Sequence, residues 1–219
     1  MNNSPNTTKT AARRKTGGIR LTKRQMQALE TKDKLYAAAL REINDKGINN
    51  VSIEDITTAA NVAKGTFYRY FESKEAVVYY TYEHSDQIYK RAFEEVKEMD
   101  FLSMITRFVR ISYTEYEKRG KGIIRAMISN YFTVPGKSFY GKDRALLQCL
   151  DGIVKAGKEQ KVLREDLPDE QCVDMLLSTM IGVEVMWCFD SQGMSLADML
   201  ENTVRVVARG MMRESAEPA

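Results

Sequence analysis

Residues 52–74, SIEDITTAANVAKGTFYRYFESK, constrain the fold most, because two short helical patterns lie there with only a few residues between them. Ser52 stands three residues before Asp55, a spacing at which the hydroxyl and the carboxylate satisfy amides that a first helical turn leaves free. The next apolar residues recur at three- and four-residue spacing and give this helix one buried side: Ile53, Ile56 and Ala60. Asn61 tolerates the left-handed backbone conformation, so it predicts a sharp turn into a second helix.

The second helical pattern begins at Ala63 and combines two aromatic residues with basic and hydroxyl-bearing ones. Phe67 and Phe71, four residues apart, predict the side that packs on the core. The other side chains are distributed around the rest of the helix: Lys64, Thr66, Tyr68, Arg69 and Tyr70. Gly65 would weaken a helix by about 0.8–1.0 kcal/mol relative to Ala, which indicates that its backbone comes close to another molecule. This composition is typical of a helix that lies in the major groove of DNA.

The segment 62–74, VAKGTFYRYFESK, resembles the DNA-binding signature of TetR-family transcriptional repressors. Segments 34–47 and 51–60 resemble the first and second helices of that family, and the residues from Ser73 onward resemble the start of its long fourth helix. Beyond about residue 95 the resemblance is one of helix pattern only. A solvated basic helix in an unrelated bundle is the alternative.

Two positions depart from the family pattern. The family commonly has Gly where Asn61 stands and Ser or Thr where Ala63 stands. The turn is therefore kept, but we expect the second helix to lack a side-chain cap and one phosphate contact.

The resemblance implies DNA-binding roles for eight residues. Hydroxyl groups on the DNA backbone would come from Ser52, Thr66, Tyr68 and Tyr70. Lys74 would add a phosphate contact at the start of the fourth helix. Lys64, Gly65 and Arg69 are the best candidates for touching base edges. Arg and Lys pair naturally with guanine O6 and N7, and a good bidentate pair discriminates by about 1–3 kcal/mol.

The whole chain is predicted to be all-α. It has 219 residues and only four prolines, and no alternating strand pattern is bounded by turn signals. After the DNA-binding part, apolar patterns predict helices at 73–97, 100–118, 121–132, 140–160, 169–189 and 195–212. We expect an N-terminal three-helix bundle with a helix-turn-helix at 31–75, a C-terminal helical ligand-binding and dimerisation domain at 76–213, and a tail at 214–219.

Residues 1–30 carry seven basic side chains and one acidic side chain, a charge of +6, so the remainder must contribute −3 to the net +3. The segment is polar and rich in Thr and Asn, which predicts a basic disordered arm. The arm is either a solubilising tail or an addition to the DNA contacts in the minor groove or on phosphates.

Segments 169–189 and 195–212 are the most apolar, and they exceed what one buried face needs. The resemblance implies that they pair with their copies in a second subunit as a four-helix dimer interface. A homodimer is also favoured because one short helix reads few base pairs, whereas two related by a twofold axis read both halves of a palindromic operator.

By resemblance, helices 100–118, 121–132 and 140–160 should surround an effector cavity. The candidate lining residues suit a partly apolar ligand with one oriented group: Phe108, Tyr113, Tyr116, Met127, Tyr131, Phe132, Met180, Glu184 and Trp187. Such a stripe at helical spacing is more often core than pocket. Glu184 would favour a cationic or hydrogen-bonding ligand if it faces inward, and would lose this role if it faces solvent or the other subunit.

Other classes of function have little support in the sequence. The three cysteines are odd in number and embedded in apolar patterns, which favours buried thiols over a disulfide or zinc framework and leaves a redox sensor as an alternative: Cys149, Cys172 and Cys188. His84 is the only histidine and has no evident nucleophile partner, so we expect no enzyme, cofactor or metal. With no membrane span or signal peptide recognised, a cytoplasmic location is expected.

The leading hypothesis is therefore a sequence-specific transcriptional regulator, a dimeric repressor released from its operator by a small-molecule effector. Linkage requires such an effector to weaken DNA binding by the factor by which DNA weakens effector binding. The alternative is a DNA-bound architectural or adaptor protein whose helical domain binds another protein without an effector.

Overall fold

The structure is a computed structural model that describes residues 22–130, 141, 143–189 and 193–213. Within these residues the regular elements are helices, which confirms the all-α expectation. The described part of the chain also contains one isolated antiparallel β-bridge, between Leu163 and Met212. The head of the molecule comprises α1 (Lys23–Lys46), η1 (Ile48–Asn50), α2 (Ile53–Ala59) and α3 (Lys64–Tyr68). The body comprises α4 (Lys74–Val96), α5 (Phe101–Tyr116), η2 (Glu117–Arg119), α6 (Lys121–Asn130), α7 (Ala145–Glu159), α8 (Asp169–Phe189) and α9 (Leu196–Met211).

The predicted turn between α2 and α3 is confirmed in its details. Ser52 Oγ accepts a hydrogen bond from the Asp55 amide at 3.1 Å, and Asp55 Oδ2 accepts one from the Ser52 amide at 2.8 Å. Asn61 adopts φ 53°, the left-handed conformation that the sharp turn requires. Ala63 caps α3 without a side-chain hydrogen bond, as the departure from the family pattern predicts.

The first helix begins earlier than the sequence analysis expected. Thr22 and Gln25 form a capping box, with Thr22 Oγ1 accepting from the Gln25 amide at 3.2 Å and Gln25 Oε1 accepting from the Thr22 amide at 2.8 Å. The expectation of a disordered arm through residue 30 is therefore wrong for residues 23–30, which form the first two turns of α1. Residues 1–21 lie outside the described residues.

The body helices fall close to their predicted ranges, and their starts are set by short polar side chains. Ser73, Asp100 and Ser195 cap α4, α5 and α9, each accepting a hydrogen bond from an amide in the first turn. Only α7 differs clearly, because it starts at Ala145 and not at residue 140.

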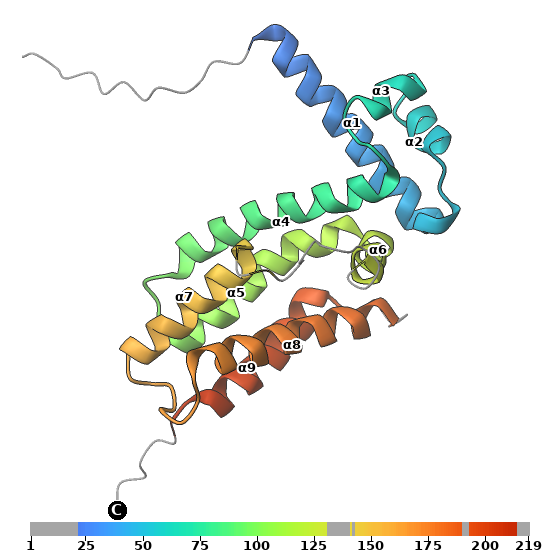
Figure 1. The fold of residues 1–219 in the computed structure, drawn as a ribbon. Coiled ribbons are helices and arrows are strands. Elements are labelled where there is room, and N and C mark those ends of the chain that lie inside the picture. The colour runs from blue at the N-terminus through green and yellow to red at the C-terminus, as the bar shows by residue number, and fades with distance from the viewer. Residues whose placement is uncertain (1–21, 131–140, 142, 190–192, 214–219) are drawn as a thin grey trace, which may run out of the picture.

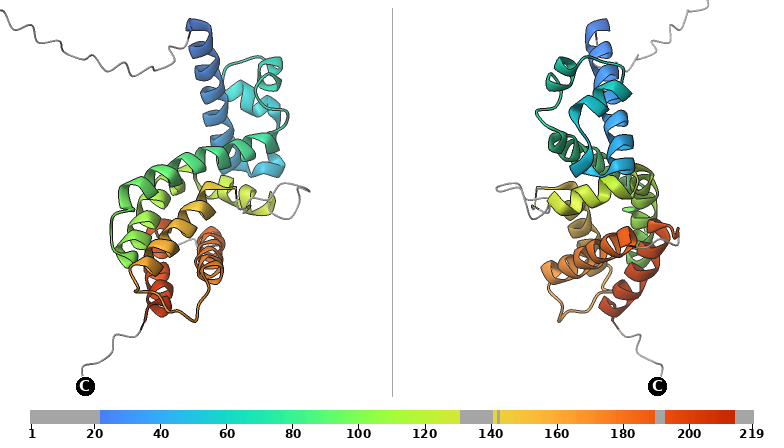
Figure 2. Two further views of the ribbon diagram at one scale, coloured as in Figure 1. Left: turned by 60° about the vertical axis from the view of Figure 1, so that its left-hand side comes forward. Right: turned by 90° about the vertical axis from the view of Figure 1, so that its right-hand side faces the viewer.

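Helix α4 runs from the head across the top of the body, and α8 and α9 lie at the end of the molecule away from the head (Figures 1 and 2). Helix α5 is central, since it packs against α4, α7 and α9. The three cysteines are buried free thiols, as predicted. Burial raises the pKa of the Cys149 thiol to about 12, which makes this thiol poorly reactive.

Candidate functional site

Helix α3 separates its side chains into a buried side and an exposed side. Phe67 is fully buried against Phe71, with ring centroids 5.7 Å apart. Tyr68 is 51% exposed although its ring packs edge-on against Phe67. The sequence predicted this helix to continue through Phe71, but it ends at Tyr68, so Arg69 and Tyr70 lie in the turn that follows. The other candidates on α3 and in this turn are exposed or half-buried: Lys64, Gly65, Thr66, Arg69 and Tyr70. Hydrophobic anchoring of the two phenylalanines therefore presents the predicted DNA-contacting residues to the outside.

Gly65 has no packing reason to be glycine. A Cβ atom built at this position would meet nothing within 4 Å in the described structure. The backbone φ of Gly65 also lies outside the left-handed region, so the fold does not require the conformational freedom of glycine. The described structure thus gives no reason for glycine at this position, and close approach of a DNA backbone or base edge stays a prediction.

Lys64 forms an ion pair with Glu54 across the turn between α2 and α3. This pair lowers the pKa of the Glu54 carboxyl and raises that of the Lys64 ammonium. Both side chains are exposed, so the pair contributes little to stability and can open at small cost. Lys64 is thus exposed on α3, and its contact with DNA stays a prediction.

Lys74 has a structural role that the sequence analysis missed. Its ammonium donates hydrogen bonds to the carbonyl oxygens of Ile48 at 2.6 Å and Val51 at 3.1 Å. These bonds tie the first turn of α4 to the segment that enters α2. Two of the three ammonium donors are occupied in this way, and the phosphate contact stays a prediction.

Asn44 joins the head to the body. Its Oδ1 accepts hydrogen bonds from the amides of Gly122 at 2.8 Å and Ile123 at 3.2 Å, and therefore caps α6 from another helix. Its Nδ2 donates to the carbonyl oxygen of Arg119 at 2.6 Å. A Cβ atom at Gly120 would clash with Asn44 Oδ1, so these hydrogen bonds also require glycine at position 120. These hydrogen bonds tie α1 of the head to the start of α6 in the body.

The predicted effector residues lie together in the core of the body, in α5, α6 and α8. Seven of them are buried: Phe108, Tyr113, Tyr116, Met127, Met180, Glu184 and Trp187. Tyr131 and Phe132 lie outside the described residues. Trp187 Nε1 donates to the carbonyl oxygen of Met194 at 2.7 Å, so the polar end of its indole faces the segment that leads to α9. In this structure the seven described residues pack as part of the hydrophobic core, which the sequence analysis gave as the alternative to a pocket.

Glu184 faces inward, which settles the question of its orientation. It is 4% exposed, and its Oε1 accepts a hydrogen bond from the hydroxyl of Tyr113 at 2.7 Å. Burial raises the pKa of the Glu184 carboxyl to about 7, while the hydroxyls of Tyr113 and Tyr116 lower it to a smaller extent. The carboxyl is therefore the most strongly perturbed acid in this part of the core.

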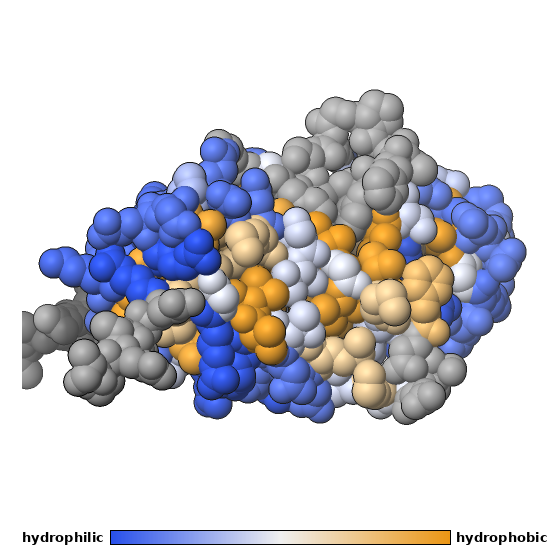
Figure 3. All heavy atoms as spheres, turned by 90° about the horizontal axis from the view of Figure 1, so that it is seen from below, coloured by the Kyte–Doolittle hydropathy of each residue, from blue (hydrophilic) through white to orange (hydrophobic). Residues whose placement is uncertain are grey.

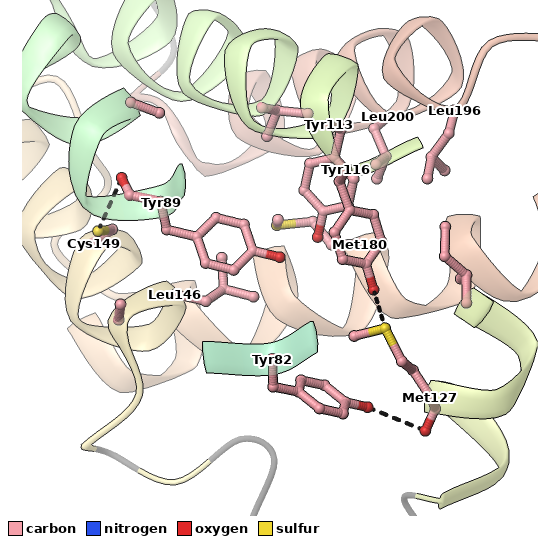
Figure 4. Close-up of a cluster of buried hydrophobic side chains, with 14 of the residues drawn as sticks. Tyr82, Tyr89, Tyr113, Tyr116, Met127, Leu146, Cys149, Met180, Leu196 and Leu200 are labelled. Carbon is pink, nitrogen blue, oxygen red and sulfur yellow. Dashed lines mark hydrogen bonds between the residues drawn. The ribbon is translucent and has the colours of Figure 1, made fainter. Parts of the chain in front are cut away.

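Helix α4 contributes side chains to this cluster that the sequence analysis did not name. The hydroxyl of Tyr82 donates to the carbonyl oxygen of Met127 at 3.1 Å, and Tyr89 lies with its ring centroid 6.3 Å from that of Tyr113 (Figure 4). The sequence spacing could have indicated this contribution, because Tyr82 and Tyr89 are seven residues apart and therefore share one face of the helix.

A helix-turn-helix head with an exposed basic and aromatic helix, carried on an all-helical body, defines a class of bacterial DNA-binding regulator. Residues 35–80 match the family model of bacterial regulatory proteins, tetR family. Over 46 residues the chain is 46% identical to an uncharacterized HTH-type transcriptional regulator, YvdT, from Bacillus subtilis (strain 168). That match spans 21% of this chain and 24% of the relative, about a quarter of its length.

Solved structures extend the similarity of fold to the body. FadR from Thermus thermophilus, a TetR-family transcriptional repressor in complex with lauroyl-CoA, has a TM-score of 0.60 at 24% identity, over 86% of this chain and 99% of that one. FadR from Bacillus subtilis, in complex with stearoyl-CoA, has a TM-score of 0.67 at 20% identity, over 81% and 98%. The head of this chain is therefore similar to the DNA-binding part of tetR-family regulators, and the head and body together have the fold of these TetR-family structures.

Proposed function

We propose that this protein is a sequence-specific transcriptional regulator that acts as a dimeric repressor and is released from its operator by a small-molecule effector. The observation that carries the DNA-binding part is the geometry of α3. Phe67 and Phe71 fix the helix in the core of the head, while Lys64, Tyr68 and Arg69 point outward. In this arrangement Arg69 and Lys64 reach base edges, and the neighbouring hydroxyls bind phosphates.

A second subunit is supported by the apolar faces of α8 and α9. Met175, Met186 and Phe189 lie on one side of α8 and are exposed, Phe189 to 78%. Val206 of α9 is 71% exposed. Figure 3 shows apolar side chains gathered in the middle of the face that contains these helices, with hydrophilic residues at both ends. Contiguous apolar surface with a polar rim is typical of a protein–protein interface.

The composition of α8 agrees with this interface. Its mean hydropathy reaches 1.6 over an 18-residue window, enough to cross a membrane by length and composition alone, yet only 39% of that window is buried in one subunit. Within the subunit, α8 packs against α6, α7 and α9. Gly182 and Gly210 have nothing within 4 Å of a built Cβ atom, which leaves room for helices of a second copy to approach closely. Pairing of α8 and α9 with their copies would cover this surface and leave the protein in the cytoplasm, where its DNA is.

Effector release follows from the connection between head and body. Helix α4 belongs to both parts, and Asn44 fastens α1 to the start of α6. An effector that binds among α4, α5, α6 and α8 would shift these helices and change the spacing of the two heads. Typical couplings of about 1–3 kcal/mol are sufficient for release. The two FadR structures, solved in complex with lauroyl-CoA and stearoyl-CoA, support a small-molecule effector for a protein of this fold.

The experiment is a gel-shift assay with DNA from upstream of this protein's own gene, against bulk DNA at moderate salt. We expect preferential binding that Arg69→Ala abolishes, and a small molecule that releases the DNA in a saturable way. Sequence preference without release by any small molecule would favour the architectural or adaptor alternative. Absence of sequence preference would contradict the proposal altogether.

A further inference from the structure

Glu184 presents an unpaired oxygen to the core of the body. Its Oε1 is hydrogen-bonded to Tyr113, but Oε2 is buried and has no hydrogen-bond partner in the described part of the chain. Its neighbours along α8 are apolar, Val183 and Val185. A buried carboxylate oxygen without a donor is costly, since burial removes the hydrogen bonds that water would supply. When the carboxyl is ionised, the site therefore lacks a donor or a cation at Oε2.

Tyrosine rings surround this carboxyl. Tyr113 and Tyr116 of α5 have ring centroids 5.2 Å apart, and Tyr89 of α4 approaches Tyr113 at 6.3 Å. All three are buried, so the region is shielded from water and charges there are weakly screened. Aromatic rings around a carboxylate attract a cation through their quadrupoles in addition to the direct charge attraction.

Two methionines fill the space between these tyrosines. Figure 4 shows Met127 and Met180 beside the hydroxyl ends of the tyrosine rings. The hydroxyl of Tyr116 donates to Met127 Sδ at 3.6 Å, and the same hydroxyl lowers the pKa of the Glu184 carboxyl. Methionine is unbranched and rotates freely about three bonds, so it can move aside more readily than a branched residue. Leu146 and Leu200 lie close by and would receive an apolar chain.

We propose that Glu184, with Tyr89, Tyr113 and Tyr116, recognises the cationic group of a lipophilic effector such as an alkylammonium compound. This inference rests on the proposed function, because it assigns the polar group of the effector that releases the DNA. The carboxylate would repel the carboxylate of a fatty acid or the phosphates of a coenzyme A ester at this position. The structure thus assigns a different effector chemistry from that in the two FadR complexes.

The test compares three ligands with the same ten-carbon chain: decyltrimethylammonium, decanol and decanoate. The two ionic compounds are used below their critical micelle concentrations and decanol below its solubility limit. Trp187 is the only tryptophan and stands three residues after Glu184, so its fluorescence reports binding in the full-length protein. We expect the cation to bind about tenfold or more tightly than the alcohol, and decanoate to bind most weakly.

Glu184→Gln keeps the shape of the side chain and an acceptor for Tyr113, and should remove the preference for the cation. The matched control is Asp174→Asn, which removes one charge at an exposed position of the same helix and should leave the preference unchanged. Equal binding of the cation and the alcohol to wild type, or a preference that survives Glu184→Gln, would overturn the inference. So would failure of the cation to bind.

A DNA-release assay with the same ligands separates this inference from the proposed function. Release by decanoate or decanol but not by the cation would leave an effector-released repressor and refute the cation site. Binding of the cation that depends on Glu184 without release of DNA would support the site and refute the effector mechanism. Release by the cation in wild type but not in Glu184→Gln supports both.

Discussion

The pH dependence of stability should change when Glu184 is replaced. The carboxyl has an ordinary pKa of 4.5, and burial raises its pKa in the folded protein to about 7. Between these two values the folded chain holds a proton that the unfolded chain has lost. The free energy of unfolding therefore falls as pH rises through this window, and the decrease is complete above the folded pKa.

The size of this effect follows from the shift in pKa. One unit corresponds to about 1.4 kcal/mol, so the full effect of Glu184 is about 3 kcal/mol at pH 8 and about 1 kcal/mol at pH 5. Glu184→Gln cannot ionise and escapes this loss. The new amide also lacks one hydrogen-bond partner, but that cost does not depend on pH. The difference in stability between variant and wild type should thus grow in favour of the variant by about 2 kcal/mol from pH 5 to pH 8.

Urea denaturation at pH 5, 6, 7 and 8 measures this difference. Both proteins must be studied at one fixed concentration, because a dimer gains stability with concentration. Every other titrating group is common to both proteins and cancels in the comparison. A stability difference that is the same at pH 5 and pH 8 would refute the proposed burial and ionisation of Glu184.

Three further substitutions test other parts of the structure. Gly65→Ala should stabilise the head by up to about 1 kcal/mol in thermal melting, because alanine favours the helix and the added methyl group meets nothing within the described chain. The same methyl group should weaken DNA binding by roughly tenfold in a gel shift, and unchanged DNA affinity would contradict the close approach. Asn44→Ala should destabilise the protein by about 2 kcal/mol in urea, since two amides of α6 lose their acceptor, whereas the exposed Asn50→Ala should change little. Val206→Glu should yield monomers in analytical ultracentrifugation with the helical circular dichroism retained, and a dimer that persists would place the interface elsewhere.

The helix-turn-helix could be predicted because its determinants are local. The cap between Ser52 and Asp55 spans three residues, Asn61 sets the turn by its own conformational preference, and Phe67 and Phe71 lie on one face of a short segment. Such features are specified within one or two helical turns and can be recognised before the fold is known.

The contacts missed by the sequence analysis connect residues that are distant in the chain. Lys74 binds the carbonyl oxygen of Ile48 26 residues earlier, and Asn44 caps an amide 78 residues later. Periodicity predicts which face of a helix is buried but not which neighbour covers it, so the approach of Tyr89 to the effector residues also required the structure. The start of α1 was missed for another reason, because the basic composition of residues 1–30 concealed the local cap at Thr22.

Footprinting of the full chain on the DNA upstream of its own gene tests the central claim most directly. The account predicts protection of a palindrome with two half-sites, bound about a thousandfold or more tightly than bulk DNA at the same salt concentration. Arg69→Ala should remove that preference while leaving the weak binding to bulk DNA nearly unchanged. Uniform, weak protection along the whole fragment, identical for wild type and variant, would contradict the account.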